Sequence, residues 1–241
     1  MVSSKRNIYY SMGLFRLLAR IFYTAAIPVL FFWVCLFNGA RIEGGQNLKG
    51  LRGAVSICNH VHKLDSALVA IAFYPRKLTF PTRPDKVKLI IPGILFRLLG
   101  CISVPQTISE TGAFFSELES LQARGGIVHF FPEGFISPYS REIHSFKRGA
   151  FHLAAGARTP VLPMAISFRE PSGFYKVFKK KPVMLLTIGE PMAPVSPDAK
   201  EDELARMENA RQLMAEMLRQ EQVASEPPQQ IPVNEPKPPG L

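Results

Sequence analysis

The sequence predicts an α/β fold in which a mixed central sheet is flanked by helices and preceded by an N-terminal membrane-binding helical element. Short apolar runs typical of buried strands alternate along the chain with helix-forming segments, and this order favours an α/β sheet. Two of the apolar runs end in turns that carry acidic or histidine side chains. The first 41 residues contain basic and apolar side chains but no acidic one.

Length and composition indicate one catalytic domain with a small extension at each end. A chain of 241 residues fits one core domain of ordinary size. Its apolar fraction of 47% and its formal net charge of +10 together point to an anionic membrane surface as a partner. Nucleic acid is not expected, because the sequence has no zinc-finger spacing, ribonucleoprotein signature or basic heptad helix. The three cysteines form no C-x-x-C pair and are interpreted as buried thiols in a reducing compartment.

Residues 1–41 form the predicted membrane-anchoring segment. Basic residues bracket an uncharged run at 21–37, whose length is at the lower limit for crossing a bilayer. A single span would keep the basic N-terminus in the cytoplasm and carry the domain to the other side. Pro28 within the run and Asn38-Gly39 after it favour instead a broken or interfacial segment that enters one leaflet and returns. We therefore expect attachment to the cytoplasmic face of a membrane, by a monotopic segment or a single apolar helix.

The core domain is predicted to extend over residues 42–222, and its apolar runs define the elements. Taken in order, they predict a strand at 54–58, helices at 66–73, 89–96 and 109–123, a strand at 127–131, a helix at 147–156, strands at 160–168 and 183–188, and a helix at 202–222. The strands are continuous apolar stretches, as in a sheet covered on both faces. The segment 89–96 fits a core helix or a second membrane-facing element, and we favour the core. Residues 223–241 are rich in Pro, Gln and Glu and are expected to be a disordered tail.

The turn after the first strand carries a histidine and an aspartate in the pattern Asn59-His60-x4-Asp65. Residues five apart on a helix point about 140° away from each other, so the two side chains cannot meet on one helix. They can meet if His60 lies in the turn and Asp65 begins the helix, where a carboxylate also suits the helix dipole. Taken alone, this spacing more often indicates a turn histidine beside a capping aspartate than a catalytic pair.

A second polar turn, Phe131-Pro132-Glu133-Gly134, follows the strand at 127–131. Strand ends on one side of an α/β sheet form a single crevice, so both turns could face one substrate. Three further motifs follow along the chain: Phe146-Lys147-Arg148-Gly149-Ala150, Val161-Leu162-Pro163-Met164-Ala165 and Gly189-Glu190-Pro191.

In order and spacing, this set of motifs resembles the glycerolipid acyltransferases typified by 1-acylglycerol-3-phosphate acyltransferase. The resemblance covers about residues 42–195. It implies an α/β fold of the glycerol-3-phosphate acyltransferase type with an N-terminal membrane-binding element. It also implies transfer of an acyl group to a hydroxyl group.

A lysolipid hydroxyl is a poor nucleophile near pH 7, so the reaction needs a positioned base, and neutral His60 is the candidate. Asp65 would accept the N–H of the second ring nitrogen and stabilise the imidazolium that forms. Backbone N–H groups at a helix start, aided by Asn59, would stabilise the oxyanion. This chemistry requires no metal, no cofactor and no covalent enzyme intermediate.

The resemblance implies acceptor binding by Glu133 and Gly134, although a turn glutamate that bonds local amides would explain Glu133 equally well. The family's motif of a glycine followed six positions later by a phosphate-binding arginine is changed here, because Gly100 is followed at that position by Gln106. Glutamine cannot supply the charge-assisted contact. Four other cations could contact the phosphate instead: Arg83, Arg141, Lys147 and Arg148.

We therefore predict a membrane-associated O-acyltransferase that moves a fatty acyl group from acyl-CoA or acyl carrier protein to a lysophospholipid. The favoured acceptor is 1-acylglycerol-3-phosphate, which would give phosphatidic acid. Two alternatives stay open. The acceptor could be another lysolipid that lacks the usual phosphate contact, or the same His-Asp dyad could hydrolyse thioesters with water as the acceptor.

Overall fold

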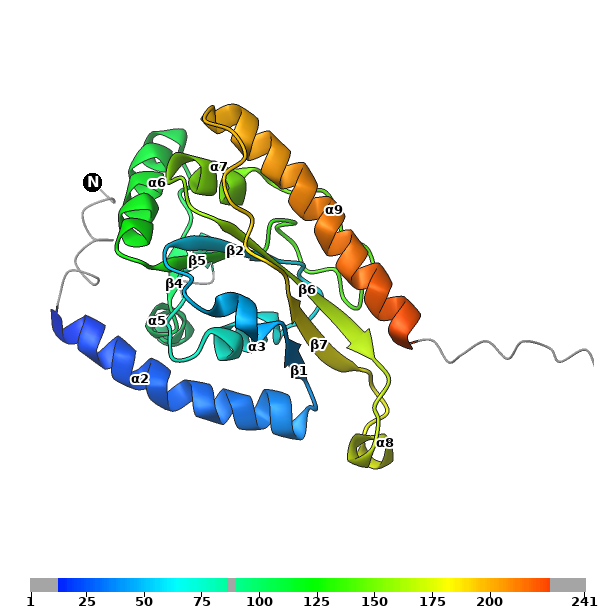
Figure 1. The fold of residues 1–241 in the computed structure, drawn as a ribbon. Coiled ribbons are helices and arrows are strands. Elements are labelled where there is room, and N and C mark those ends of the chain that lie inside the picture. The colour runs from blue at the N-terminus through cyan, green and yellow to red at the C-terminus, as the bar shows by residue number, and fades with distance from the viewer. Residues whose placement is uncertain (1–12, 86–89, 226–241) are drawn as a thin grey trace, which may run out of the picture.

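The computed structural model describes residues 13–85 and 90–225 and is built around a five-stranded mixed sheet with the order β1-β7-β6-β2-β5 (Figure 1). The strands are β1 (Arg41–Glu43), β2 (Ala54–Cys58), β5 (Ile127–Phe130), β6 (Val161–Arg169) and β7 (Val183–Ile188). β2 pairs in parallel with β5 and β6, whereas β6 and β7 are antiparallel and β1 joins β7 in parallel. This topology confirms the predicted α/β fold with a mixed sheet.

A second, two-stranded parallel sheet extends the parallel side of the first. It consists of β3 (Phe80–Thr82) and β4 (Cys101–Ser103). Thr79 forms a parallel bridge with Val128 of β5, and its carbonyl accepts the N–H of His129 at 2.8 Å. The carboxyl ends of β2, β3, β4, β5 and β6 therefore point the same way, and the turns that follow them share one edge of the molecule.

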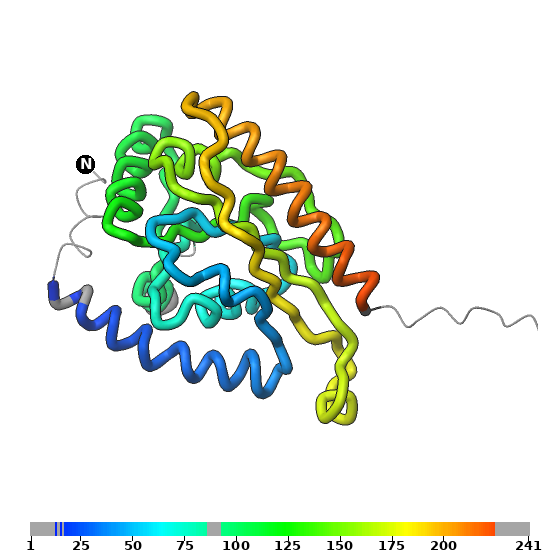
Figure 2. Tube along the Cα trace, in the orientation of Figure 1, coloured from blue at the N-terminus to red at the C-terminus, as the bar shows by residue number. Residues whose placement is uncertain are grey.

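Helices cover both faces of the sheet (Figure 1). They are α2 (Gly13–Phe31) with a π-helical end η1 (Phe32–Phe37), the 3-10 turn η2 (Gly45–Leu48), α3 (Asp65–Phe73), α5 (Ile90–Leu98), α6 (Ile108–Ala123), α7 (Gly149–Gly156), α8 (Phe174–Phe178) and α9 (Ala199–Ser225). α2, α3 and α5 lie on one face, and α6, α7 and α9 lie on the other. Figure 2 shows the same course of the chain as a continuous trace.

The side chains of β2 show why the sheet is buried on both sides. Every residue of this strand is buried, and alternate residues join different clusters. Ala54 and Cys58 pack with α2 and α3, while Val55 and Ile57 pack with α6, α7 and α9. A strand covered on both faces needs a continuous apolar sequence, and this is the pattern that predicted the strand.

Most predicted elements are present, and their ends differ for local reasons. The strands predicted at 54–58 and 183–188 match β2 and β7 residue for residue. α9 begins before the predicted residue 202, because Asp198 caps it and accepts the N–H of Glu201 at 2.8 Å. α9 continues to Ser225, beyond the predicted start of the tail at 223, and residues 226–241 lie outside the described residues.

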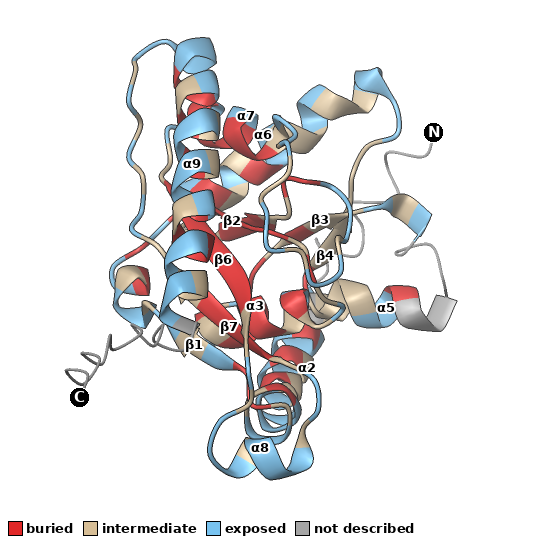
Figure 3. Cartoon of the chain, turned by 90° about the vertical axis from the view of Figure 1, so that its right-hand side faces the viewer, coloured by how far each residue is buried: buried red, intermediate tan, exposed pale blue. Residues whose placement is uncertain are grey.

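Two expectations about apolar helices are wrong. α2 continues through Pro28 without a break, so the predicted interruption there is absent, and the helix changes instead to π geometry at its end. α5 is not a core helix, because Ile94 and Leu95 are about half exposed and the helix packs against α2. Figure 3 shows the contrast between the buried strands and the exposed outer faces of the helices.

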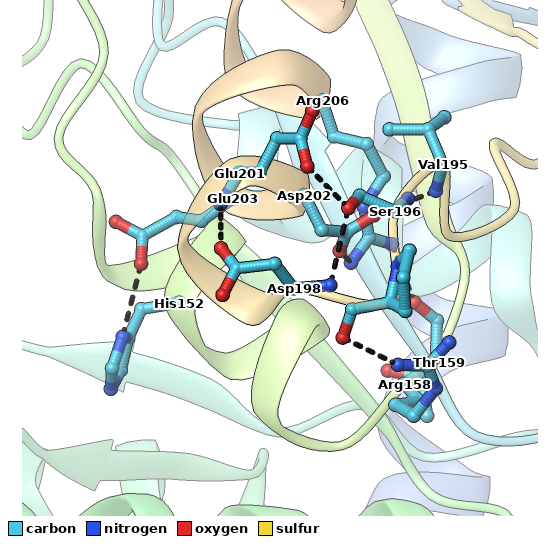
Figure 4. Close-up of polar contacts among 11 residues, drawn as sticks. His152, Arg158, Thr159, Val195, Ser196, Asp198, Glu201, Asp202, Glu203 and Arg206 are labelled. Carbon is cyan, nitrogen blue, oxygen red and sulfur yellow. Dashed lines mark hydrogen bonds and ion pairs between the residues drawn. The ribbon is translucent and has the colours of Figure 1, made fainter.

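A buried ion pair fixes the start of α9 against the domain (Figure 4). Arg206 is fully buried and pairs with Asp202 one turn earlier, and it also donates to the carbonyl of Thr159 at 2.7 Å. The other carboxylate oxygen of Asp202 accepts the N–H of Val195 at 2.7 Å. Each buried charge therefore has polar neighbours, as buried charges require, and of these two side chains only the Nε atom of the Arg206 guanidinium is buried without a hydrogen-bond partner in the described residues.

Candidate active site

His60 and Asp65 meet in the turn between β2 and α3. His60 lies in the turn, and Asp65 is the first residue of α3, as the spacing predicted. The Nδ1 atom of His60 lies 2.9 Å from Oδ2 of Asp65, with the aspartate fully buried and the imidazole partly exposed. Because the carboxylate accepts the Nδ1 proton, Nε2 is the ring nitrogen that can accept a proton from a substrate.

The Oδ2 atom of Asp65 also accepts two backbone N–H groups, from Val61 at 2.7 Å and from His62 at 2.8 Å. These bonds hold the turn around the carboxylate and fix the direction in which His60 points. They also use the two amides that lie nearest the dyad, so these N–H groups are not available to an oxyanion. Within residues 13–85 and 90–225, the second oxygen, Oδ1, is buried without a hydrogen-bond partner.

The turn after β5 packs directly against the dyad. The imidazole of His60 stacks on the ring of Phe131, and the carbonyl of His60 accepts the N–H of Ser137 at 2.7 Å. The N–H of Tyr139 donates to the carbonyl of Val61 at 3.0 Å. The two polar turns predicted to share one crevice are therefore joined by stacking and by backbone hydrogen bonds.

A second histidine lies behind this stack. His129 on β5 is buried, meets the edge of the Phe131 ring and forms a 3.0 Å hydrogen bond between its Nδ1 and the hydroxyl of Ser56. Burial, together with the charge of His60, lowers the pKa of His129 from 6.5 to about 3. His129 is therefore neutral in the folded protein near pH 7.

Glu133 is buried at the end of the same turn. Burial raises the pKa of its carboxyl group, against the opposing effects of the His144 charge and backbone. In the described part of the chain, neither carboxylate oxygen has a partner with normal hydrogen-bond geometry. Burial of a carboxyl group whose oxygens accept no hydrogen bond lowers the free energy of unfolding. A ligand that donates hydrogen bonds to these oxygens would offset this cost, so the side chain suits contact with a polar acceptor.

Gly134 and Lys147 lie together beside Glu133. Gly134 has a φ of +76°, which favours glycine, and a Cβ atom there would lie 2.6 Å from the Nζ atom of Lys147. The backbone N–H of Lys147 donates to the carbonyl of Pro132 at 2.8 Å. The position over Gly134, which the resemblance assigns to the acceptor, is thus occupied by the end of the Lys147 side chain, whose ammonium lies against the glycine.

Asn59 has a different role from the one predicted. Its side chain is fully buried, and its amide pairs with the backbone of Ile166 in β6, accepting at 2.7 Å and donating at 2.9 Å. The amide therefore joins the ends of β2 and β6, and this corrects its predicted role as an oxyanion donor.

The other three predicted cations make contacts with residues outside the turn. Arg83 follows β3 and forms an exposed ion pair with Asp85 at 3.2 Å. Arg148 pairs with Glu203 of α9, and the same carboxylate contacts His152 at 3.1 Å. The His152 contact is visible in Figure 4. The carbonyl of Arg141 accepts a hydrogen bond from Gln222, which places this residue beside the end of α9.

Comparison with known proteins decides the family. Residues 39–167, more than half of the chain, match the family model described as Acyltransferase. The chain belongs to the acyltransferase family. No match was found among curated protein sequences. The match includes both polar turns, so the His60–Asp65 pair and Glu133 lie within the acyltransferase domain.

A solved structure shares the acyltransferase fold of this chain. The crystal structure of the 1-acyl-sn-glycerophosphate (LPA) acyltransferase PlsC from Thermotoga maritima superposes with a TM-score of 0.58 and 22% sequence identity. The match covers 85% of this chain and 78% of the other. In residues 13–85 and 90–225, no group of three or more His, Cys, Asp or Glu side chains could hold a metal ion.

The sequence does not predict two histidines that the structure places at the candidate site. His129 was included only in an apolar strand, although a histidine within a buried run is itself an unusual signal. His144 lowers the pKa of Glu133 and lies 3.2 Å from the hydroxyl of Ser137 through its Nε2 atom. No pattern in the sequence linked His144 to the turn, because the loop between them has no regular structure.

Proposed function

We propose that this acyltransferase moves a fatty acyl group from a thioester donor to the hydroxyl of a lysophospholipid, with His60 as the general base. The observation that carries the proposal is the 2.9 Å contact between His60 and buried Asp65, directly against the turn that holds Glu133. This arrangement offers a base with a fixed tautomer beside a buried acceptor-binding group.

The reaction uses Nε2 of His60, the ring nitrogen that does not contact Asp65. Nε2 of His60 takes the proton of the acceptor hydroxyl while the oxygen attacks the thioester carbonyl. Asp65 stabilises the imidazolium that results. Collapse of the tetrahedral intermediate breaks the carbon–sulfur bond, and the departing thiolate takes the proton from the imidazolium. The ester forms, the thiol leaves, and the dyad returns to its initial state without a covalent enzyme intermediate.

A phosphate-bearing acceptor fits the surroundings of the turn. Lys147 places its ammonium beside Gly134, where it can compensate for the uncharged Gln106. Glu133 would accept a hydrogen bond from the glycerol moiety. The similar PlsC structure belongs to an enzyme described as acting on LPA. We therefore favour 1-acylglycerol-3-phosphate as the acceptor and phosphatidic acid as the product.

The position of α2 supports monotopic attachment to a membrane. The segment Leu17–Phe37 is long and apolar enough to cross a bilayer by length and composition. However, its buried residues, from Ala19 through Tyr23 and Ile27 to Val34, pack against the domain over about 22 Å of helix. A helix bound along its length to the domain cannot cross the bilayer by itself, whereas its exposed apolar face can lie in one leaflet.

The function can be tested with the purified full chain and radiolabelled acyl-CoA or acyl carrier protein, with and without lysolipid acceptors. Labelled phosphatidic acid should appear only when 1-acylglycerol-3-phosphate is present. H60A should abolish transfer, whereas H152A, which changes an exposed histidine bound to Glu203, should retain it. Release of labelled fatty acid at the same rate without acceptor would identify a hydrolase and overturn the proposal.

The attachment can be tested by protease protection in sealed vesicles. An N-terminal tag and the core domain should both be digested from the same face. Protection of one and digestion of the other would show a true span and overturn the monotopic arrangement.

A further inference from the structure

The connection between β6 and β7 carries a short helix with an exposed apolar face. Residues 170–182 extend beyond the sheet and contain α8, at the lower end of the molecule in Figures 1 and 2. Phe174, Val177 and Phe178 are 74%, 78% and 70% exposed. Their spacing places them on one side of the helix, and the two phenylalanine rings lie 4.8 Å apart. This face has no covering element in the described residues, although folding normally buries such side chains.

Two neighbouring side chains, Tyr175 on α8 and Lys179 directly after it, hold α8 against the end of the N-terminal helix. The hydroxyl of Tyr175 donates to the carbonyl oxygens of Leu36 and Cys35, the latter at 3.3 Å. Lys179 donates through Nζ to the carbonyl and the side-chain oxygen of Asn38, at 2.8 and 2.9 Å. α8 is therefore fixed in orientation relative to η1, and its apolar face is presented outward by these contacts.

The end of the N-terminal helix beside α8 is also apolar and exposed. Phe32, Trp33, Leu36 and Phe37 are between 51% and 62% exposed, and the rings of Trp33 and Phe37 stack with centroids 4.8 Å apart. Figures 1 and 3 both place α8 at the same end of the molecule as α2. Two segments that are about 140 residues apart in sequence thus contribute to one apolar surface.

Positive charge lies beside this surface on the β6–β7 connection. Lys176, Lys180 and Lys181 are exposed, and Glu170 at the start of residues 170–182 is the one acidic residue of this connection. Apolar side chains bordered by lysines suit the interface of an anionic bilayer, where rings enter the acyl-chain boundary and ammonium groups contact phosphates. An acidic protein would complement the lysines alone, whereas a bilayer complements the lysines and the apolar face that continues into η1.

We propose that α8 is a second membrane-inserting element, whose Phe174, Val177 and Phe178 enter an anionic bilayer beside the end of η1. The proposal rests on the monotopic attachment inferred above and adds a contact from the second half of the chain. Attachment at α8 as well as along α2 sets the tilt of the domain on the membrane. One helix alone would leave the domain free to rock about the helix axis.

Vesicle binding of the full chain tests the proposal. F174S/V177S/F178S should reduce partitioning onto phosphatidylcholine–phosphatidylglycerol vesicles by about 10-fold or more. The control I108S/V195S/V223S removes three other apolar side chains that are more than half exposed and should bind as the wild type. K176Q/K180Q/K181Q should lose the preference for anionic over pure phosphatidylcholine vesicles. Wild-type partitioning of the α8 triple variant would overturn the proposal.

A second experiment measures the insertion of α8 into the bilayer directly. Trp33 is the only tryptophan of the chain, so W33F/F178W carries a single fluorophore on α8. Its fluorescence should be quenched by lipids brominated on the acyl chain, and unquenched fluorescence on bound protein would contradict insertion. Two outcomes would assign the surface to a protein partner and also overturn the proposal. One is a wild-type protein that is dimeric in solution and an α8 triple variant that is monomeric. The other is loss of acyl carrier protein binding in this variant with unchanged vesicle binding.

Activity separates this proposal from the proposed function. The α8 triple variant should retain transfer to a water-soluble, short-chain lysolipid and lose transfer to acceptors embedded in vesicles. If the wild type transfers to no acceptor while the vesicle results hold, the proposed function fails and the role of α8 stands. Equal loss on soluble and embedded acceptors, with unchanged vesicle binding, would contradict the role of α8.

Discussion

The imidazole of His60 lies flat against the ring of Phe131, with ring centroids 4.0 Å apart and 15° between their planes. The two residues come from the two polar turns, which follow neighbouring parallel strands. The hydrogen bond to Asp65 fixes one ring nitrogen, and the stack fixes the plane of the ring. Together these contacts restrict the direction in which Nε2 can accept a proton.

Phe131→Leu should lower kcat for acyl transfer by roughly 10-fold, because aromatic contacts of this kind contribute about 0.5–1.5 kcal/mol and keep the imidazole in one plane. The KM for the acceptor should change little. Phe115→Leu is the matched control, since Phe115 makes an edge contact with His152 outside the site. Steady-state kinetics of both variants would check this, and an equal loss in the control would exclude a specific role for the stack.

Asp65→Asn should lower kcat by roughly 10²–10⁴-fold while the fold is retained. The amide oxygen can still accept the three hydrogen bonds that Oδ2 accepts, but the negative charge that stabilises the imidazolium is lost. Asp85→Asn removes a half-exposed carboxylate from an ion pair and serves as the control. Retention of full kcat in the Asp65 variant would show that the charge of Asp65 is not needed to stabilise the imidazolium.

Lys147→Gln should raise the KM for 1-acylglycerol-3-phosphate by roughly 10-fold, because a charge-assisted contact to phosphate is lost. The KM for an uncharged monoacylglycerol should stay the same. Arg148→Gln is the neighbouring control, since that guanidinium already pairs with Glu203. A larger effect in Arg148→Gln would assign the phosphate contact to the arginine.

His129 should make the protein less stable as the pH falls. Its pKa is lowered to about 3 in the folded state against 6.5 as the ordinary value, so the unfolded chain binds the extra proton between these values. The free energy of unfolding should therefore fall below about pH 6.5, by at most about 1.4 kcal/mol per pH unit from this group. His129→Asn can retain the bond to Ser56 and should flatten this slope in urea unfolding measured from neutral to acidic pH. An unchanged slope would mean that His129 does not titrate as inferred.

Asp202→Ala should lower the free energy of unfolding by about 3–5 kcal/mol, because it leaves the Arg206 guanidinium buried and unpaired. Replacing both partners by apolar residues, as in D202L/R206M, should recover much of the loss. Glu208→Ala breaks an exposed ion pair on the same helix and should have no measurable effect. Urea unfolding curves would show the difference, and equal stabilities of the two single variants would contradict it.

The sequence was most informative where one local pattern determines the structure. β2 and β7 are continuous apolar runs, and their bounds follow from that pattern alone. β1, β3 and β4 are three residues long, too short to show any period, and they depend on partners such as Leu185 for Arg41. Their existence is a property of the assembled sheet and could not be read from local sequence.

The same distinction holds for the site. The spacing from His60 to Asp65 is local, so the turn and the start of the helix could be predicted. The pairing of Asn59 with Ile166 joins residues 107 positions apart, so local sequence cannot distinguish this structural role from the predicted oxyanion contact. The neutral state of His129 depends on burial by β5 and its neighbours, which no spacing rule contains.

Only residues 38–40 separate the end of η1 from β1, the first strand of the sheet. In a bilayer-bound enzyme, a connection this short keeps the catalytic edge at a constant height and angle to the lipid plane. Enzyme and acceptor then meet by diffusion in two dimensions. The rate should consequently follow the surface density of lysolipid in the membrane, and it should fall when inert lipid dilutes the acceptor at constant bulk concentration.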